Sequence, residues 1–348
     1  MRTEELLRIA RRRKLDRVLV TDLANVKALT GVNCDNAVVE ATGDRVVFYT
    51  DFRYVPMVHR VAPELAVRDI RRLGMGKRCP HRFCRIGYES SISHARFLAW
   101  QKLFPKATFV DVAKDLAQMR AVKTPEEIAA LRAAEKLNCE IWETARGKFR
   151  AGMTEREMAR IIQKLMIEKG EGEAFATIVC VGKNAAECHH EPDDTVWNGC
   201  EPVLVDMGVK LGGVCSDLTR NLVPRSSRGA RVSRTYRQVY QLVLEANLAA
   251  IAAAKPGMTG KALDKVARDV IRKGGFGKCF GHSLGHGVGY EIHEAPYASK
   301  KGDMVLKPGM LVTIEPGIYL EDNLGVRIED LVLITETGCE VLSLTAAK

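Results

Sequence analysis

Two aspartates lie close together in the stretch VDMGVKLGGVCSDLTRN, residues 205–221. Asp206 ends an apolar run that begins at Pro202, and Asp217 follows eleven residues later, after a turn at Gly212-Gly213. This pattern predicts a hairpin, in which side chains on one face lie close enough to share a ligand. Two facing carboxylates repel each other unless a cation or a shared proton lies between them. The stretch alone fits a metal site and a solvated hairpin with two surface acids equally well.

Three more residues that could do chemistry lie in the glycine-rich segment FGHSLGHGVGYEIHEAP, residues 280–296: His282, His286 and His293. Glycines allow close backbone approach and positive φ, and imidazoles supply metal ligands or proton carriers near neutral pH. A single histidine could be structural, but three within twelve residues favour a functional site. An earlier segment, AECHHEP, contains His189 and His190, of which we expect one to be functional and the other solvated.

The 348 residues are enough for two domains. We expect a small N-terminal α/β domain with helices at 4–14 and 93–103 and strands at 16–21, 37–41, 45–50, 85–88 and 108–112. Thr124, Pro125 and Glu127 together are typical of a helix start, with an N-cap, a proline at the first helical position and a capping-box glutamate. We therefore place the domains at 1–122 and 123–348.

The second domain contains an internal repeat. The Gly-Met-Thr triplet at 152–154 recurs at 257–259, each time after a long predicted helix and before a shorter one. Asp206 and Asp217 have counterparts in Glu315 and Glu329, which lie in later strand-like runs. Two copies of this length predict a pseudo-twofold domain, whose symmetry would bring the four carboxylates together.

Composition and charge narrow the function classes. The net charge of +10 comes from the residues up to and including Lys123, where 24 Lys and Arg face 13 Asp and Glu, and many of these basic residues lie on one predicted helix. A solvated helix face is the first interpretation, an oligomer contact the second and nucleic-acid binding a distant third. No apolar run is long enough to span a membrane, and ten scattered cysteines predict free thiols in the cytoplasm. The segment CPHRFC, residues 79–84, is better explained as a loop than as a zinc site.

Five residues, in order, resemble the dinuclear metal signature of the pita-bread metallopeptidases, within them the aminopeptidase P and prolidase branch: Asp206, Asp217, His286, Glu315 and Glu329. The short motifs around these residues, DMG, SDLTR, EPGIY and GVRIED, match this family too. The resemblance continues into the N-terminal domain through Thr30-Gly31, residues 50–54 and residues 86–89. It therefore covers nearly the whole chain.

The resemblance implies two divalent metal ions per chain that share a hydroxide, and the oxygen-rich ligand set suits Mn²⁺ first, with Co²⁺ or Zn²⁺ as alternatives. It implies that Glu315, besides binding metal, shuttles a proton. His189 and His293 would hold the substrate carbonyl, and His282 would line the pocket for a proline ring. Arg327 would orient an acid ligand such as Asp217, although it could also be structural. A homodimer and a proline-containing peptide substrate are implied as well.

Two departures from the family pattern bear on the reaction. Glu-Cys-His-His replaces the usual Leu-Pro-His, so the choice between His189 and His190 stays open. Tyr297 stands where several prolidases carry an arginine that could bind the carboxylate of a dipeptide. We therefore predict an Xaa-Pro aminopeptidase, with an Xaa-Pro dipeptidase as the alternative. A non-catalytic binding module is the rival from another class, and the intact ligand set argues against it.

Overall fold

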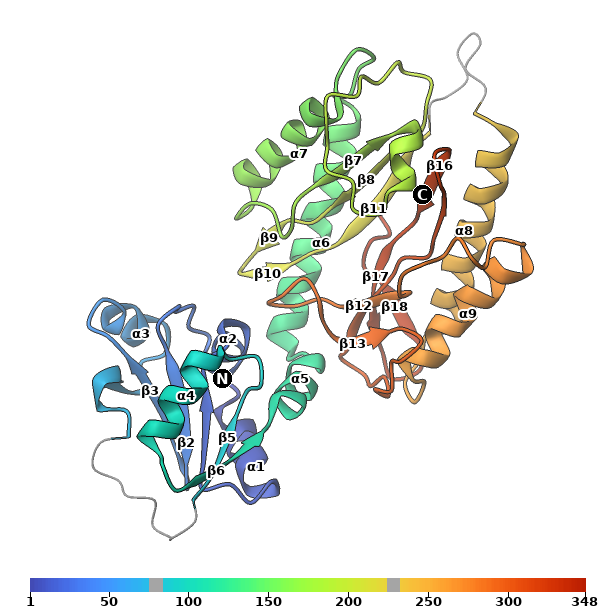
Figure 1. The fold of residues 1–348 in the computed structure, drawn as a ribbon. Helices are drawn as coiled ribbons and strands as arrows, with labels where there is room; N and C mark the ends of the chain where they lie inside the picture. The colour runs from blue at the N-terminus through green and yellow to red at the C-terminus, as the bar shows by residue number, and fades with distance from the viewer. Residues whose placement is uncertain (75–83, 224–231) are drawn as a thin grey trace. The chain divides into compact units, whose positions relative to one another are not determined.

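The computed structural model describes residues 1–74, 84–223 and 232–348. The chain forms two compact units, Met1–Arg120 and Ala121–Lys348, which are described separately (Figure 1). Both mix helices and strands, so the predicted α/β class is confirmed. Residues 79–83 of the CPHRFC segment lie outside the described residues, and Cys84 is the first residue described after them.

A six-stranded mixed sheet, ordered β4-β3-β2-β1-β5-β6, forms the centre of the N-terminal unit. Its strands are β1 (Arg17–Val20), β2 (Val38–Thr42), β3 (Arg45–Thr50), β4 (Ala66–Asp69), β5 (Cys84–Tyr88) and β6 (Ala107–Asp111). The helices are α1 (Thr3–Arg12), α2 (Leu23–Thr30), α3 (Val55–Val61), the 3₁₀ helix η1 (Ile70–Arg72), α4 (His94–Leu103) and α5 (Ala113–Ala121). Buried Leu19, Ile86 and Trp100 belong to one apolar cluster of this unit.

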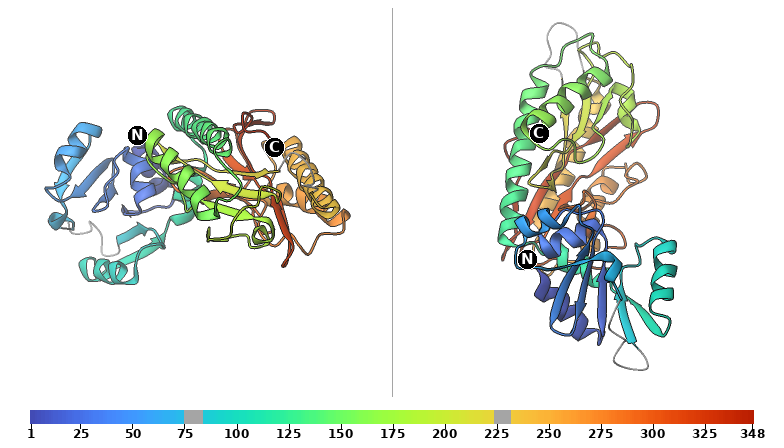
Figure 2. Two further views of the ribbon diagram at one scale, coloured as in Figure 1. Left: turned by 90° about the horizontal axis from the view of Figure 1, so that it is seen from above. Right: turned by 90° about the vertical axis from the view of Figure 1, so that its left-hand side faces the viewer.

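The C-terminal unit contains two helix pairs: α6 (Pro125–Arg146) with α7 (Glu155–Lys169), and α8 (Arg234–Ala253) with α9 (Gly260–Lys273). Its strands, with the 3₁₀ helix η2 (Gly182–Ala186), are β7 (Ile178–Val181), β8 (Val203–Met207), β9 (Lys210–Leu211), β10 (Val214–Cys215), β11 (Leu218–Leu222), β12 (Gly285–Gly287), β13 (Glu294–Ala298), β14 (Leu311–Ile314), β15 (Gly317–Leu320), β16 (Leu324–Arg327), β17 (Asp330–Ile334) and β18 (Cys339–Val341). The helix pairs lie on opposite sides of the strands (Figures 1 and 2). This arrangement confirms the predicted pseudo-twofold domain.

Local sequence explains where the helices of the first pair begin. Thr124 accepts a hydrogen bond from the Glu127 amide, and the Glu127 carboxylate accepts one from the Thr124 amide. Thr154 and Glu157 form the same capping box at the start of α7. Both boxes satisfy amides that would otherwise lack partners at a helix start.

Two expectations are corrected by the structure. Cys84 is part of a disulfide, so the prediction of free thiols is wrong for that residue. The glycines at 281, 285, 287 and 289 do not have positive φ, although close approach of another backbone segment does explain Gly285 and Gly287. In the part of the chain that the structure describes, no helix is long and apolar enough to cross a membrane.

Candidate metal centre

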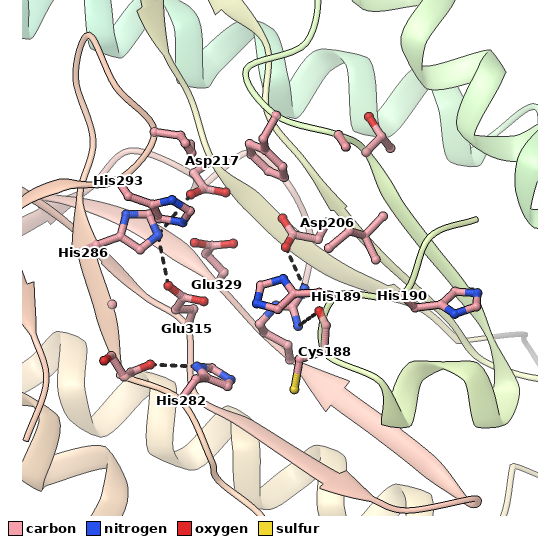
Figure 3. Close-up of a pocket in the computed structure, with 18 of the residues that line it drawn as sticks. Cys188, His189, His190, Asp206, Asp217, His282, His286, His293, Glu315 and Glu329 are labelled. Atoms are coloured by element: carbon pink, nitrogen blue, oxygen red, sulfur yellow. Dashed lines mark hydrogen bonds and ion pairs between the residues drawn. The ribbon is translucent and has the colours of Figure 1, made fainter. Parts of the chain in front are cut away.

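A cavity of about 510 Å³ in the C-terminal unit collects every residue that the sequence singled out for chemistry (Figure 3). The four carboxylates come from both halves of the pseudo-twofold domain. All nine predicted site residues line it: His189, Asp206, Asp217, His282, His286, His293, Glu315, Arg327 and Glu329. His190 and Tyr297 line it as well.

The first two acids are placed by the predicted hairpin. Asp206 lies on β8 and pairs in register with Thr219 of β11, while Asp217 directly precedes β11. The short strands β9 and β10 form the tip of the hairpin. The antiparallel register therefore brings Asp206 and Asp217 to the same cavity.

Glycine allows the second half to bring its imidazole to the acids. His286 lies on β12, and a Cβ at Gly285 would lie 1.9 Å from the Thr313 carbonyl oxygen of β14. Only a glycine permits such close approach of two backbones. Glu315 directly follows β14, so the tight packing of β12 on β14 sets His286 beside Glu315.

The ligand atoms lie close together. His286 Nε2 is 3.3 Å from Glu315 Oε1 and 3.6 Å from Asp217 Oδ2. Asp217, His286 and Glu329 each offer an atom within 4.8 Å of the other two. Figure 3 shows these side chains, with Asp206 and Glu315, around one centre.

The electrostatics of this cluster fit bound cations. Burial, followed by the charge of Glu329, raises the pKa of Asp217 well above its usual value. Burial and Glu315 raise the pKa of Glu329 in the same way. Asp206 Oδ1 is buried and has no hydrogen-bond partner among the described residues. Converging buried carboxylates and an oxygen without a donor suit divalent ions that prefer oxygen and imidazole ligands.

Arg327 contacts a different acid from the one suggested by the sequence. Its Nη2 donates to Asp206 Oδ2 at 2.6 Å, whereas we expected an acid such as Asp217. Its Nε donates to Thr219 Oγ1, and Thr219 in turn donates to Glu329 Oε2 at 2.7 Å. Arg327 and Thr219 thus connect acids of the two halves.

The four histidines that line the cavity besides His286 differ in their surroundings. His282 Nε2 lies 2.9 Å from Tyr319 Oη, and the His293 ring packs edge-on against His286 at a centroid distance of 4.3 Å. His189 lies beside the acid cluster, whereas His190 is directed away from it (Figure 3). Nε2 of His190 is instead 2.7 Å from Glu155 Oε2.

Sequence reasoning missed two threonines that support the acids. Thr219 donates to Glu329, and Thr313 donates to Glu315 Oε1 while accepting from the His286 amide. Thr219 lies two residues after Asp217, and Thr313 lies two residues before Glu315. Because side chains alternate along a strand, each threonine lies on the same face as its acid. That period-two pattern was a signal that could have identified both.

Comparison with known proteins decides the family. The model of metallopeptidase family M24 matches residues 129–336, and the creatinase/prolidase N-terminal domain matches residues 2–122. The chain belongs to metallopeptidase family M24. The resemblance stated from the sequence is therefore confirmed, and membership of this family implies divalent metal.

Relatives match over the whole length. The Xaa-Pro dipeptidase of Pyrococcus furiosus is 34% identical over 346 residues, which are 99% of this chain and 98% of that protein. The solved Xaa-Pro dipeptidase of Bacillus anthracis has a TM-score of 0.90 and 30% identity, covering 99% of this chain and 98% of its own. The X-Pro aminopeptidase of Thermotoga maritima has a TM-score of 0.85 and 31% identity, covering 97% of each chain.

Proposed function

We propose that the protein is a metal-dependent exopeptidase that hydrolyses the bond between an N-terminal residue and a following proline. The observation that carries this proposal is the convergence of four carboxylates and His286 in one cavity, beside four more histidines. The names of the relatives supply the substrate class. A binding module without metal would have no need for this buried acid cluster.

Two divalent ions would be held by the five predicted ligands: Asp206, Asp217, His286, Glu315 and Glu329. Four carboxylates against two divalent ions make a neutral set, and the ligand types favour Mn²⁺, with Co²⁺ or Zn²⁺ as alternatives. When bound, the metals would polarise the substrate carbonyl and lower the pKa of water.

The remaining residues would bind and orient the peptide. His189 and His293 would donate hydrogen bonds to the scissile carbonyl oxygen as negative charge develops there. The Glu315 carboxylate would take up a proton from the water that attacks the carbonyl carbon and pass it to the proline nitrogen as the bond between that carbon and nitrogen breaks. His282, held by Tyr319, would line the pocket of the proline ring, and Arg327 would hold Asp206 in place. We assign His189 rather than His190 to the substrate because His190 is directed toward Glu155.

The length of the substrate divides the proposal into two candidates. The dipeptidase names of two relatives favour Xaa-Pro dipeptides. Xaa-Pro aminopeptidase is the second candidate, since Tyr297 lines the cavity and Arg327 is the one Lys or Arg among the described residues that do so. Arg327 is already paired with Asp206, which leaves a dipeptide carboxylate without an obvious cationic partner there.

Hydrolysis of an Xaa-Pro dipeptide and of the matching Xaa-Pro-Yaa tripeptide tests both candidates, with Mn²⁺ returned to chelated enzyme and Asp217→Asn as the inactive control. Cleavage of the dipeptide alone identifies the dipeptidase, and cleavage of the tripeptide alone identifies the aminopeptidase. Absence of metal-dependent cleavage of either peptide contradicts the proposed function.

We also infer that residues 1–122 form a separate domain that restricts substrate length and mediates a homodimer in the cytoplasm. This role of residues 1–122 is tested by comparing the full chain with residues 123–348. Sedimentation would measure the dimer, and a series of peptides would measure the preferred substrate length. An unchanged dimer that keeps the same length preference would contradict it.

A further inference from the structure

Glu155, the first residue of α7, is fully buried and lies outside the predicted site. Its Oε1 accepts hydrogen bonds from the Val181 amide at 2.6 Å and from Asn184 Nδ2 at 2.9 Å. Its Oε2 accepts from His190 Nε2 at 2.7 Å and from the Asp193 amide at 3.1 Å. One carboxylate therefore fixes four points of a thirteen-residue segment, residues 181–193.

This segment carries His189, which lines the cavity. The side chain of the very next residue, His190, is tied to Glu155, so the backbone direction at His189 depends on that contact. The Glu155 amide also donates to the Thr195 carbonyl, which extends the attachment beyond Asp193. The carboxylate is placed well for this role because it lies at a helix N-terminus, where negative charge is stabilised.

Charge strengthens the contact between His190 and Glu155. Burial alone would lower the pKa of His190, but the neighbouring carboxylates of Glu155, Glu187 and Asp193 outweigh it, and the net pKa is raised. Nδ1 of His190 faces Glu187 Oε2 at 3.3 Å, so both ring nitrogens face carboxylates. Such a pair is a charge-assisted hydrogen bond, which is shorter and stronger than a neutral one.

A second metal site is the alternative, because Glu155, His190 and Asp193 offer atoms within 4.8 Å of one another. The four N–H groups already directed at Glu155 argue against it. A metal ion would displace the buried amide donor of Val181 and the half-buried one of Asp193, and buried donors without partners are costly. The carboxylate therefore acts as an anchor.

We propose that Glu155 is a positioning residue, whose carboxylate holds residues 181–193 so that His189 faces the carbonyl oxygen of the substrate. The role of His189 comes from the function proposed above. The anchor itself can be tested without it, because Glu155 fixes the segment whether or not a peptide is cleaved.

The main variant is Glu155→Gln, which keeps the shape of the side chain but places an NH₂ group against N–H donors. Glu157→Gln is its matched control, since it makes the same change in the same helical turn at an exposed position, where a glutamine can still form the capping box with Thr154. His190→Ala is a second variant, which removes one donor and leaves Glu155 in place should Glu155→Gln not fold.

Hydrogen exchange of residues 182–193, followed by mass spectrometry, measures the anchor directly. We expect exchange at least about tenfold faster in Glu155→Gln or His190→Ala, with the wild-type rate retained in Glu157→Gln. Unchanged exchange in both anchor variants would overturn the proposal, even if the wild-type enzyme cleaves no Xaa-Pro peptide.

Kinetics then test whether the anchor acts through His189. We expect Glu155→Gln to lower kcat by about 10- to 100-fold with KM within about twofold, the pattern of an interaction made only in the transition state. In a His189→Ala background, Glu155→Gln should lower kcat by less than about threefold. A full additional loss in that background would show a general structural defect and overturn the positioning role.

Discussion

In the first half of the C-terminal unit one buried carboxylate, that of Glu155, anchors the segment that carries His189. In the second half an ion pair on α9 anchors the segment that carries His282. There Asp264 accepts from the Leu284 amide, and Arg268 donates to the Phe280 and His282 carbonyls. The Arg268 guanidinium also lies 4.1 Å from the Phe280 ring centroid. The helices α7 and α9 occupy equivalent places, yet they use different residues for the same task.

The two halves of the pseudo-twofold repeat therefore share the arrangement of helices and strands, but different contacts hold the segments that carry His189 and His282. The first anchor is a single anion, so its loss should release the whole segment. The second has two partners that hold different points, so the loss of either should be milder. The acids of the site are further shared between halves, through Arg327 to Asp206 and Thr219 to Glu329.

The largest expected effect comes from the shared metal centre. Asp217→Asn removes a carboxylate that lies within reach of His286 and Glu329. We expect kcat to fall by more than about 100-fold, because outer contacts of a metal site alone are typically worth 10- to 100-fold. Metal content by mass spectrometry should fall as well, while Glu157→Gln retains both. An active Asp217→Asn enzyme with full metal content would exclude Asp217 as a ligand.

The second prediction contrasts the two anchors. Arg268→Met should raise KM by about three- to tenfold with kcat within about threefold, since it loosens the segment that carries His282 at the proposed proline pocket. Arg272→Met is the control, because Arg272 forms an exposed ion pair on the same helix. A loss confined to kcat, as expected for Glu155→Gln, would show that the two anchors are equivalent.

A third prediction concerns the contact between halves. Thr219→Val leaves Glu329 Oε2 and Arg327 Nε without their buried hydroxyl partner. We expect the free energy of unfolding of the chelated protein to fall by about 1–3 kcal/mol in urea denaturation. Thr144→Val removes an exposed hydroxyl on α6, and we expect it to lower the free energy of unfolding by less than about 0.5 kcal/mol. Equal losses in the two variants would contradict a specific role for Thr219.

The smallest effect is the pH dependence of the first anchor. The folded-state pKa of His190 is raised, so its stabilising contribution is complete below the unfolded pKa and is lost as the pH rises through the folded pKa. Wild type should therefore exceed His190→Gln in stability most at pH 5–6, and the difference should shrink toward pH 9. A difference that grows with pH would show that neutral His190 forms the anchor.

Local patterns of the chain could be predicted from the sequence because nearby residues determine them. The capping boxes of Thr124 and Thr154 and the hairpin of Asp206 and Asp217 depend on short-range contacts, and all are present. The short elements α3 and β4 were not predicted, since neither has enough residues for a clear period.

The contacts around the site depend on residues far apart in the chain. Arg327 donates to Asp206, 121 residues away, and no local pattern distinguishes Asp206 from Asp217 as its partner. The orientation of His190 depends in the same way on Glu155, 35 residues earlier. The sequence could therefore predict which residues gather, but not which neighbour each one binds.

Hydrolysis of two peptides that differ only at the second residue, proline or alanine, tests the proposed function most directly. The enzyme would be assayed after chelation and again after Mn²⁺, Co²⁺ or Zn²⁺ is returned. We predict cleavage of the proline peptide that requires the returned metal, with little cleavage of the alanine peptide. Equal cleavage of the two peptides, or cleavage that persists in the chelated enzyme, would contradict a metal-dependent Xaa-Pro peptidase.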